Sequence, residues 1–182
     1  MPKINQDFRK KLLQYDKKCM EILSSQCPEI QFKVLDDEET PELYEVSYYL
    51  KTIISEKYGK PIYQNGDIPT IIFFDFSKPF YPCGGLHLKV KSQVPYHPNW
   101  YENGILSHGD MRWLGVIERI IFVAKIIQFQ PQVTAQYDVC NRNAKVFWEK
   151  NKYREIFPCD DTKIPSVEEI ETLMPKIKIR RS

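Results

Sequence analysis

The sequence contains no apolar run of the roughly 18 residues needed to cross a bilayer, and no signal-peptide-like apolar run at its start. An excess of one charge is also missing, because 26 Lys and Arg stand against 24 Asp and Glu, for a net charge of +2. Such a balance gives no field that would draw nucleic acid or an acidic membrane to the chain as a whole. We therefore expect a soluble cytoplasmic protein with no nucleic-acid and no membrane partner, in which any basic partner site is local.

Cysteine pairs and histidine clusters are also missing. The five cysteines include no C-x-x-C pair, and an odd number is poor material for a disulfide framework. The three histidines never stand four residues apart, and no acidic residues group with them as zinc ligands would. We expect reduced thiols, no metal site and no cofactor. Cys83 and Cys140 are interpreted as small buried hydrophobic residues rather than as nucleophiles.

The chain has 182 residues, 42% of them hydrophobic, which is enough for one substantial core. Residues 5–24 place apolar side chains at a helical period, and Pro28 is expected to stop this helix. Four strands are predicted by alternating or β-branched apolar residues, at 30–34, 43–55, 71–76 and 86–90.

The second half of the chain predicts an irregular segment followed by helices. Residues 94–113 show no sustained period, and functional residues often lie on such segments. Residues 116–129 are apolar on most sides, which predicts a buried helix ended by Pro131. Further helices are expected at about residues 141–152 and from about Ser166, where Ser-Val-Glu-Glu is a capping-box pattern. This order predicts an α+β fold with an antiparallel sheet.

A group of motifs falls in and around the irregular segment: Tyr81-Pro82, Tyr96-His97-Pro98-Asn99, Asn103-Gly104, Trp113 and the N-x-x-A element Asn141 to Ala144. In order and spacing they resemble the motifs of the ubiquitin-conjugating enzymes, over roughly residues 5–155. The resemblance implies that family's α+β UBC fold, with an N-terminal helix, a four-stranded antiparallel meander, an irregular active-site segment and C-terminal helices. It implies a UBC-like domain at 1–158 and an extension at 159–182 with a terminal helix and a basic tail.

The resemblance also implies an activity. In the family, ubiquitin or a similar modifier passes from its activating enzyme to a cysteine as a thioester, and then to a lysine amine, usually with a ligase. Ser107 stands where that cysteine belongs, eight residues after Asn99. The asparagine that matches Asn99 stabilises the oxyanion or braces the loop, and the histidine that matches His97 is mainly structural. The implied catalytic residues are Ser107, Asn99 and His97. The implied partners are the activating enzyme, the modifier and a ligase.

Serine at position 107 is the main departure from the family. A hydroxyl is a much weaker nucleophile than a thiol near neutral pH, and the sequence places no obvious base beside it. Three interpretations stay open: an engineered replacement of the cysteine, a natural inactive variant that binds the modifier or a partner, and serine chemistry through an oxyester. The retained His-Pro-Asn motif favours the first, and the existence of inactive family members supports the second. The chain as written is therefore not assigned as an enzyme.

Two candidate partner surfaces also come from the resemblance. In the family the first helix helps to bind the activating enzyme, so the basic cluster Arg9, Lys10 and Lys11 is a candidate docking patch. Cys83 and Leu114 occupy loop positions that contact the ligase in the family. Neither is the usual residue there, which argues against binding to a common RING-type ligase.

Overall fold

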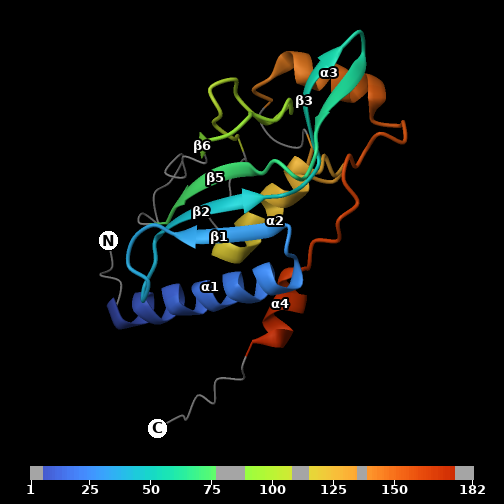
Figure 1. Ribbon diagram of the computed structural model, residues 1–182. Coiled ribbons are helices and arrows are strands. Elements are labelled where there is room, and N and C mark those ends of the chain that lie inside the picture. The colour runs from blue at the N-terminus through green and yellow to red at the C-terminus, as the bar shows by residue number, and fades with distance from the viewer. Residues whose placement is uncertain (1–5, 77–88, 108–114, 135–138, 175–182) are drawn as a thin grey trace.

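The computed structural model describes residues 6–76, 89–107, 115–134 and 139–174. Helix α1, Gln6–Gln26, runs past the first strand at one side of the sheet (Figure 1). Leu13, Cys19, Met20 and Leu23 recur at helical spacing and are buried against the core. The helix ends just before Pro28, as the sequence predicts, since proline cannot continue its hydrogen bonding.

The main sheet has four antiparallel strands in the order β1-β2-β5-β6. They are β1, Ile30–Val34; β2, Leu43–Tyr48; β5, Thr70–Asp75; and β6, Lys89–Val90. Tyr48 of β2 lies between Ile30 and Thr70 in the register. Alternate residues of β2 and β5 are buried, so one face of the sheet packs on the core. The α+β fold class with an antiparallel sheet is thus confirmed.

The prediction of a single strand over residues 43–55 is wrong. The chain leaves the sheet after Tyr48, and the backbone N–H of Lys51 donates to Asp160 Oδ2 at 2.6 Å. A separate two-stranded ribbon follows, formed by β3, Thr52–Lys57, and β4, Lys60–Gln64. This ribbon projects from one end of the molecule (Figure 1). Strand β5, rather than the next strand in sequence, therefore pairs with β2, and the predicted simple meander carries an inserted hairpin.

Helix α2, Val116–Ile127, lies behind the sheet in Figure 1 and is buried along most of its length. The sequence predicts this helix over residues 116–129, and in the structure it ends two residues earlier, at Ile127. Phe129 adopts a φ of +57°, and the backbone N–H of Gln130 returns to the carbonyl of Lys125. This left-handed turn closes the helix before proline is reached.

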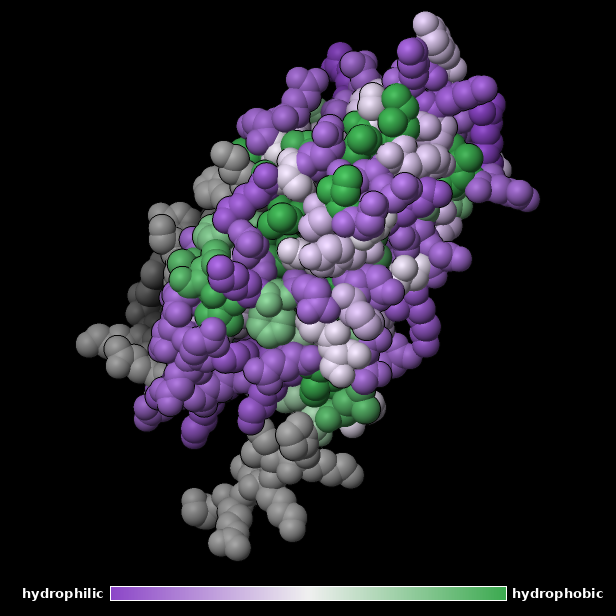
Figure 2. Space-filling model, viewed as in Figure 1, coloured by the Kyte–Doolittle hydropathy of each residue, from purple (hydrophilic) through white to green (hydrophobic). Residues whose placement is uncertain are grey.

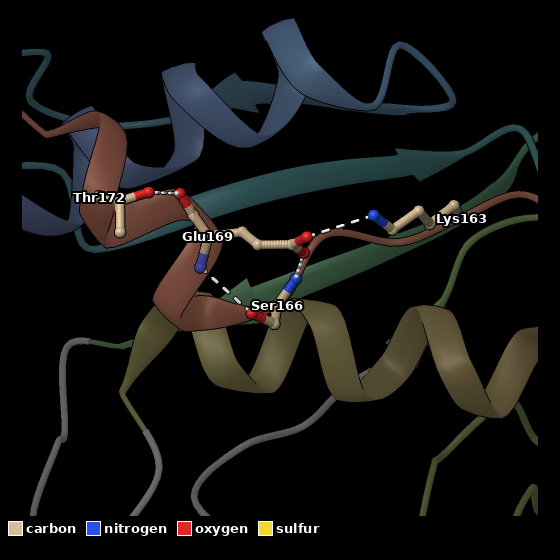
Figure 3. A network of polar contacts seen from close by, with 4 residues as sticks. All are labelled: Lys163, Ser166, Glu169 and Thr172. Carbon is tan, nitrogen blue, oxygen red and sulfur yellow. Dashed lines mark hydrogen bonds and ion pairs between the residues drawn. The ribbon is translucent and has the colours of Figure 1, made fainter.

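The last helices are α3, Arg142–Asn151, and α4, Val167–Leu173. The capping box predicted for α4 is confirmed, because Ser166 Oγ accepts from the Glu169 N–H and Glu169 Oε2 accepts from the Ser166 N–H (Figure 3). Helix α4 packs on α1 and α2, and its Ile170 joins the main core. No helix of the described residues is long and apolar enough to span a bilayer. The division of the chain at residue 158 stays a prediction.

A second, smaller core lies where the β3–β4 ribbon meets α3. It consists of Ile53, Phe129, Phe147 and Cys159. Tyr63 of β4 and Trp148 of α3 pack against it. The ribbon and α3 therefore share one end of the molecule, beside the irregular segment.

Candidate functional site

Residues 94–107 contain no helix or strand, as the sequence predicts, but they fold back on themselves. A β-bridge pairs Trp100 with Leu106, and the N–H of Gly104 donates to the Tyr101 carbonyl at 2.9 Å. Gly104 has a φ of +84°, and an added Cβ would lie 3.3 Å from the carbonyl oxygen of Val90. Glycine is required there because L side chains avoid this conformation. The Asn-Gly turn thus reverses the chain inside the predicted site.

This reversal brings Asn99 and Ser107 together. The backbone N–H of Ser107 donates to the Asn99 carbonyl at 2.8 Å. Asn99 is fully buried and Ser107 is half-buried. Two residues that the motif spacing selected are therefore neighbours on adjacent antiparallel segments.

His97 stabilises the start of this turn. Its Nδ1 accepts a hydrogen bond from the Asn99 N–H at 3.1 Å, and its ring lies 4.4 Å from that of Phe129. Complete burial lowers the pKa of His97 to about 3, because the charged form would lose its hydration. His97 is therefore neutral near pH 7 and braces the backbone of Asn99. The resemblance implies a mainly structural role for this histidine, and that role stays a prediction.

The segment before α3 closes on the same turn. The Pro98 carbonyl accepts from the N–H groups of Cys140 and Asn141, at 2.9 and 3.1 Å. Asn141 caps α3 by accepting from the Ala144 N–H at 3.0 Å. An open pocket of about 440 Å³ lies between the turn residues 101–103 and residues 140–143.

The prediction that Cys140 is buried is wrong. It was expected to be buried, but it is half-buried, lines the pocket and places Sγ 3.7 Å from the Asn99 carbonyl oxygen. Cys140 lies at the entry to α3, where its backbone N–H donates to the Pro98 carbonyl and its side chain stays half-buried. The sequence does place Cys140 directly before the N-x-x-A element, where the chain enters a helix, and this was the available sign of partial exposure.

Ser107 has no activating group in the part of the chain that the structure describes. Its hydroxyl makes no hydrogen bond with a described residue. His108, Cys83 and Leu114 lie outside the described residues, so the two predicted ligase-contact positions are not placed. The contact that the structure shows at this position is therefore the backbone hydrogen bond between the half-buried Ser107 and the buried Asn99.

The basic cluster on α1 is largely paired within the chain. Arg9 forms an ion pair with Glu42, and Lys10 pairs with Glu39 at 2.9 Å. Lys17 pairs with Glu38 at 2.7 Å. All three carboxylates belong to the loop between β1 and β2. A partner that docks on this helix through charge would have to compete with that loop.

A scan against protein-family models found no match to this chain, and a search of curated proteins found none either.

Proposed function

We propose that this chain has the fold of the ubiquitin-conjugating enzymes and belongs to a ubiquitin-like modification pathway, with Ser107 at the position that would receive the modifier. The observation that supports the proposal is the 2.8 Å hydrogen bond between the Ser107 N–H and the Asn99 carbonyl. A chance match of short motifs would not require their residues to meet in space. In this chain Asn99 meets Ser107 and Pro98 meets Asn141, within an α+β fold whose element order is the expected one apart from the inserted β3–β4 hairpin. Tyr81-Pro82 and Trp113 lie outside the described residues.

The neighbourhood of Ser107 fits acyl transfer better than proton transfer. A tetrahedral intermediate at residue 107 would need a hydrogen-bond donor for its oxyanion, and the buried amide of Asn99 is the side chain that the resemblance assigns to this task. His97 is neutral and already uses Nδ1 to hold the Asn99 backbone. Asn99 supplies electrostatic stabilisation and His97 supplies its position.

A second function follows from the serine. Among the described residues no base contacts the Ser107 hydroxyl, and an unassisted hydroxyl accepts an acyl group poorly at neutral pH. This favours, as the alternative, an inactive relative that binds the modifier or a partner without accepting it covalently. In both readings the modifier or its pathway enzymes are the partners, together with an activating enzyme and a ligase where transfer occurs.

Three versions of the chain that differ at residue 107 distinguish a conjugating enzyme from an inactive binding variant. The full chain, Ser107→Cys and Ser107→Ala are each incubated with ATP and a panel of activating enzymes with their modifiers. A thiol-sensitive adduct in Ser107→Cys that is absent from Ser107→Ala supports a disabled conjugating enzyme. A thiol-resistant, base-sensitive adduct in the unchanged chain supports oxyester chemistry.

The remaining outcomes are equally informative. An adduct that persists in Ser107→Ala would locate the nucleophile at a native cysteine and refute the role of residue 107. No adduct in any version, together with modifier binding by titration, supports the adaptor. No adduct and no binding count against the family assignment.

A further inference from the structure

One end of the molecule carries a local excess of positive charge. Residues 51–64 and 141–154, which we call the basic ribbon surface, hold eight Lys and Arg and only two acidic residues, a net charge of +6. They form the β3–β4 ribbon and α3, whose side chains share the second core. Figure 1 shows both at the same end of the molecule. The net charge of the whole chain is only +2, so it does not reveal the excess of positive charge at this end.

The opposite charge lies elsewhere and is partly neutralised. Residues 36–45 hold six carboxylates, of which four form ion pairs with Arg9, Lys10, Lys17 and Lys91. On the basic ribbon surface, the ion pair between described residues is Lys145 with Glu149 at 3.6 Å. The positive charge there is therefore mostly unpaired and directed to solvent.

Exposed aromatic rings stand among these cations. Tyr58 is 92% exposed at the tip of the ribbon and Tyr153 is 90% exposed just after α3. Lys57 lies 5.5 Å from the ring of Tyr58, and Lys152 lies 5.1 Å from that of Tyr153. Each ring therefore has a lysine over one face, and its high exposure leaves the other face available to a planar ligand.

The tip of the ribbon holds Tyr58 in an unfavourable backbone conformation. Its φ is +54° and that of Gly59 is +74°, as in a two-residue type I′ turn. Asparagine is the usual residue at that first position, since a bulky aromatic residue is strained at positive φ. The turn therefore presents a large ring where a small polar residue would fold more easily.

We propose that the basic ribbon surface binds single-stranded nucleic acid, with lysines contacting phosphates and the rings of Tyr58 and Tyr153 stacking on bases. Interspersed cations and exposed rings are the two elements that such binding needs. This revises the expectation, based on net charge, that nucleic acid is not a partner.

Other partners fit this end less well. Lysine is depleted at the cores of protein interfaces, and an added peptide strand would meet Pro61 and the flanking lysines at β4. Membrane-surface segments expose a continuous apolar face, whereas Figure 2 shows this end mostly in purple and pale colours with small separate green areas.

The test is fluorescence anisotropy of the full chain with labelled oligo(U) and oligo(dT) of about 20 nucleotides, titrated at salt concentrations from about 50 to about 200 mM. Lys57→Gln/Lys60→Gln removes two candidate phosphate contacts. Lys18→Gln/Lys33→Gln is the control with the same charge change, since both lysines are exposed on α1 and β1. We expect the first pair to lower the slope of log affinity against log salt by about 1.4, because each single-strand phosphate contact contributes about 0.7. The control pair should leave the slope unchanged.

Stacking is tested separately from charge. Tyr58→Asn keeps a residue suited to the turn and should weaken binding by about fivefold to a hundredfold, whereas Tyr58→Phe should retain it. Tyr153→Ala and Tyr153→Phe should differ in the same way.

Several results would overturn the proposal: no binding at about 50 mM salt, equal losses from the two lysine pairs, or duplex bound as tightly as single strands. Binding to vesicles of anionic lipid without binding to either oligonucleotide would also overturn it, in favour of a membrane surface.

Discussion

Asp16 on α1 provides a quantitative test of how the first helix packs. Only 8% of Asp16 and 7% of Arg119, which faces it from α2, are exposed. Burial raises the pKa of Asp16 to about 7, and the attraction of Arg119 opposes this only in part. Glu118 adds a smaller repulsion. Below about pH 7 the folded state therefore holds this carboxyl in its protonated form.

The sign and size of the effect follow from linkage. Because the pKa of Asp16 is about 7 in the folded state against an ordinary 3.8, the folded protein holds the proton more tightly. The stability that this proton adds is fully present below an ordinary aspartate pKa and is lost as the pH rises through about 7. A shift of about three units corresponds to about 4 kcal/mol as an upper bound. Asp16→Asn, which imitates the protonated form, should raise the free energy of unfolding at about pH 8 by up to that amount, and by little at about pH 4.

Urea denaturation followed by circular dichroism, repeated in steps of pH, measures the difference in the free energy of unfolding between Asp16→Asn and the unchanged chain. His97 acts in the opposite direction, since burial lowers its pKa to about 3 and its contribution is lost as the pH falls below 6.5. The variant must therefore be compared with the unchanged chain at each pH, so that the His97 contribution cancels. Glu21→Gln, an exposed change that removes one negative charge from the same helix, is the control. A loss of stability in Asp16→Asn at about pH 8, or a difference independent of pH, would refute the reasoning.

Four further outcomes are expected. Asn141→Ala should lower the free energy of unfolding by about 1 kcal/mol through loss of the α3 cap, and the exposed Asn143→Ala should change it far less, both by urea denaturation. Gly104→Ala should cost about 1 to 2 kcal/mol in the same assay, because its φ of +84° strains any L side chain. Of the four cysteines that the structure describes, Cys140 should react first with iodoacetamide, since the others are buried; peptide mapping by mass checks the order. The ring signals of His97 should not titrate between about pH 5 and 8 in NMR spectra, and a transition near its ordinary pKa of 6.5 would contradict its burial.

Much of the fold could be predicted from periodicity and capping. The apolar stripe of α1, the nearly all-apolar α2 and the Ser166 capping box are local patterns, and the structure has all three. The β3–β4 ribbon could not be predicted in the same way. Residues 43–55 are equally rich in β-forming residues on both sides of the break, and the departure at Lys51 depends on Asp160, which lies far along the chain.

Contacts in the candidate site that depend on short spacing along the sequence could be predicted. Contacts between segments far apart in the sequence could not. The Asn-Gly turn made the approach of Asn99 and Ser107 a reasonable inference. The closure of Cys140 on Pro98, and the pairing of Arg9 with the acidic loop, are long-range contacts with no local pattern. The local excess of positive charge was hidden because the net charge of the whole chain also counts the six carboxylates of residues 36–45.

The proposed function is tested most directly by the intact mass of the Ser107→Cys chain after incubation with ATP, an activating enzyme and its modifier. The account predicts, for at least one pair, a gain of one modifier less one water, mapped to residue 107, removed by thiol and absent from Ser107→Ala. An unchanged mass with every pair, from folded protein and alongside a conjugating enzyme that loads in the same tube, would contradict the assignment of residue 107 as a modifier acceptor.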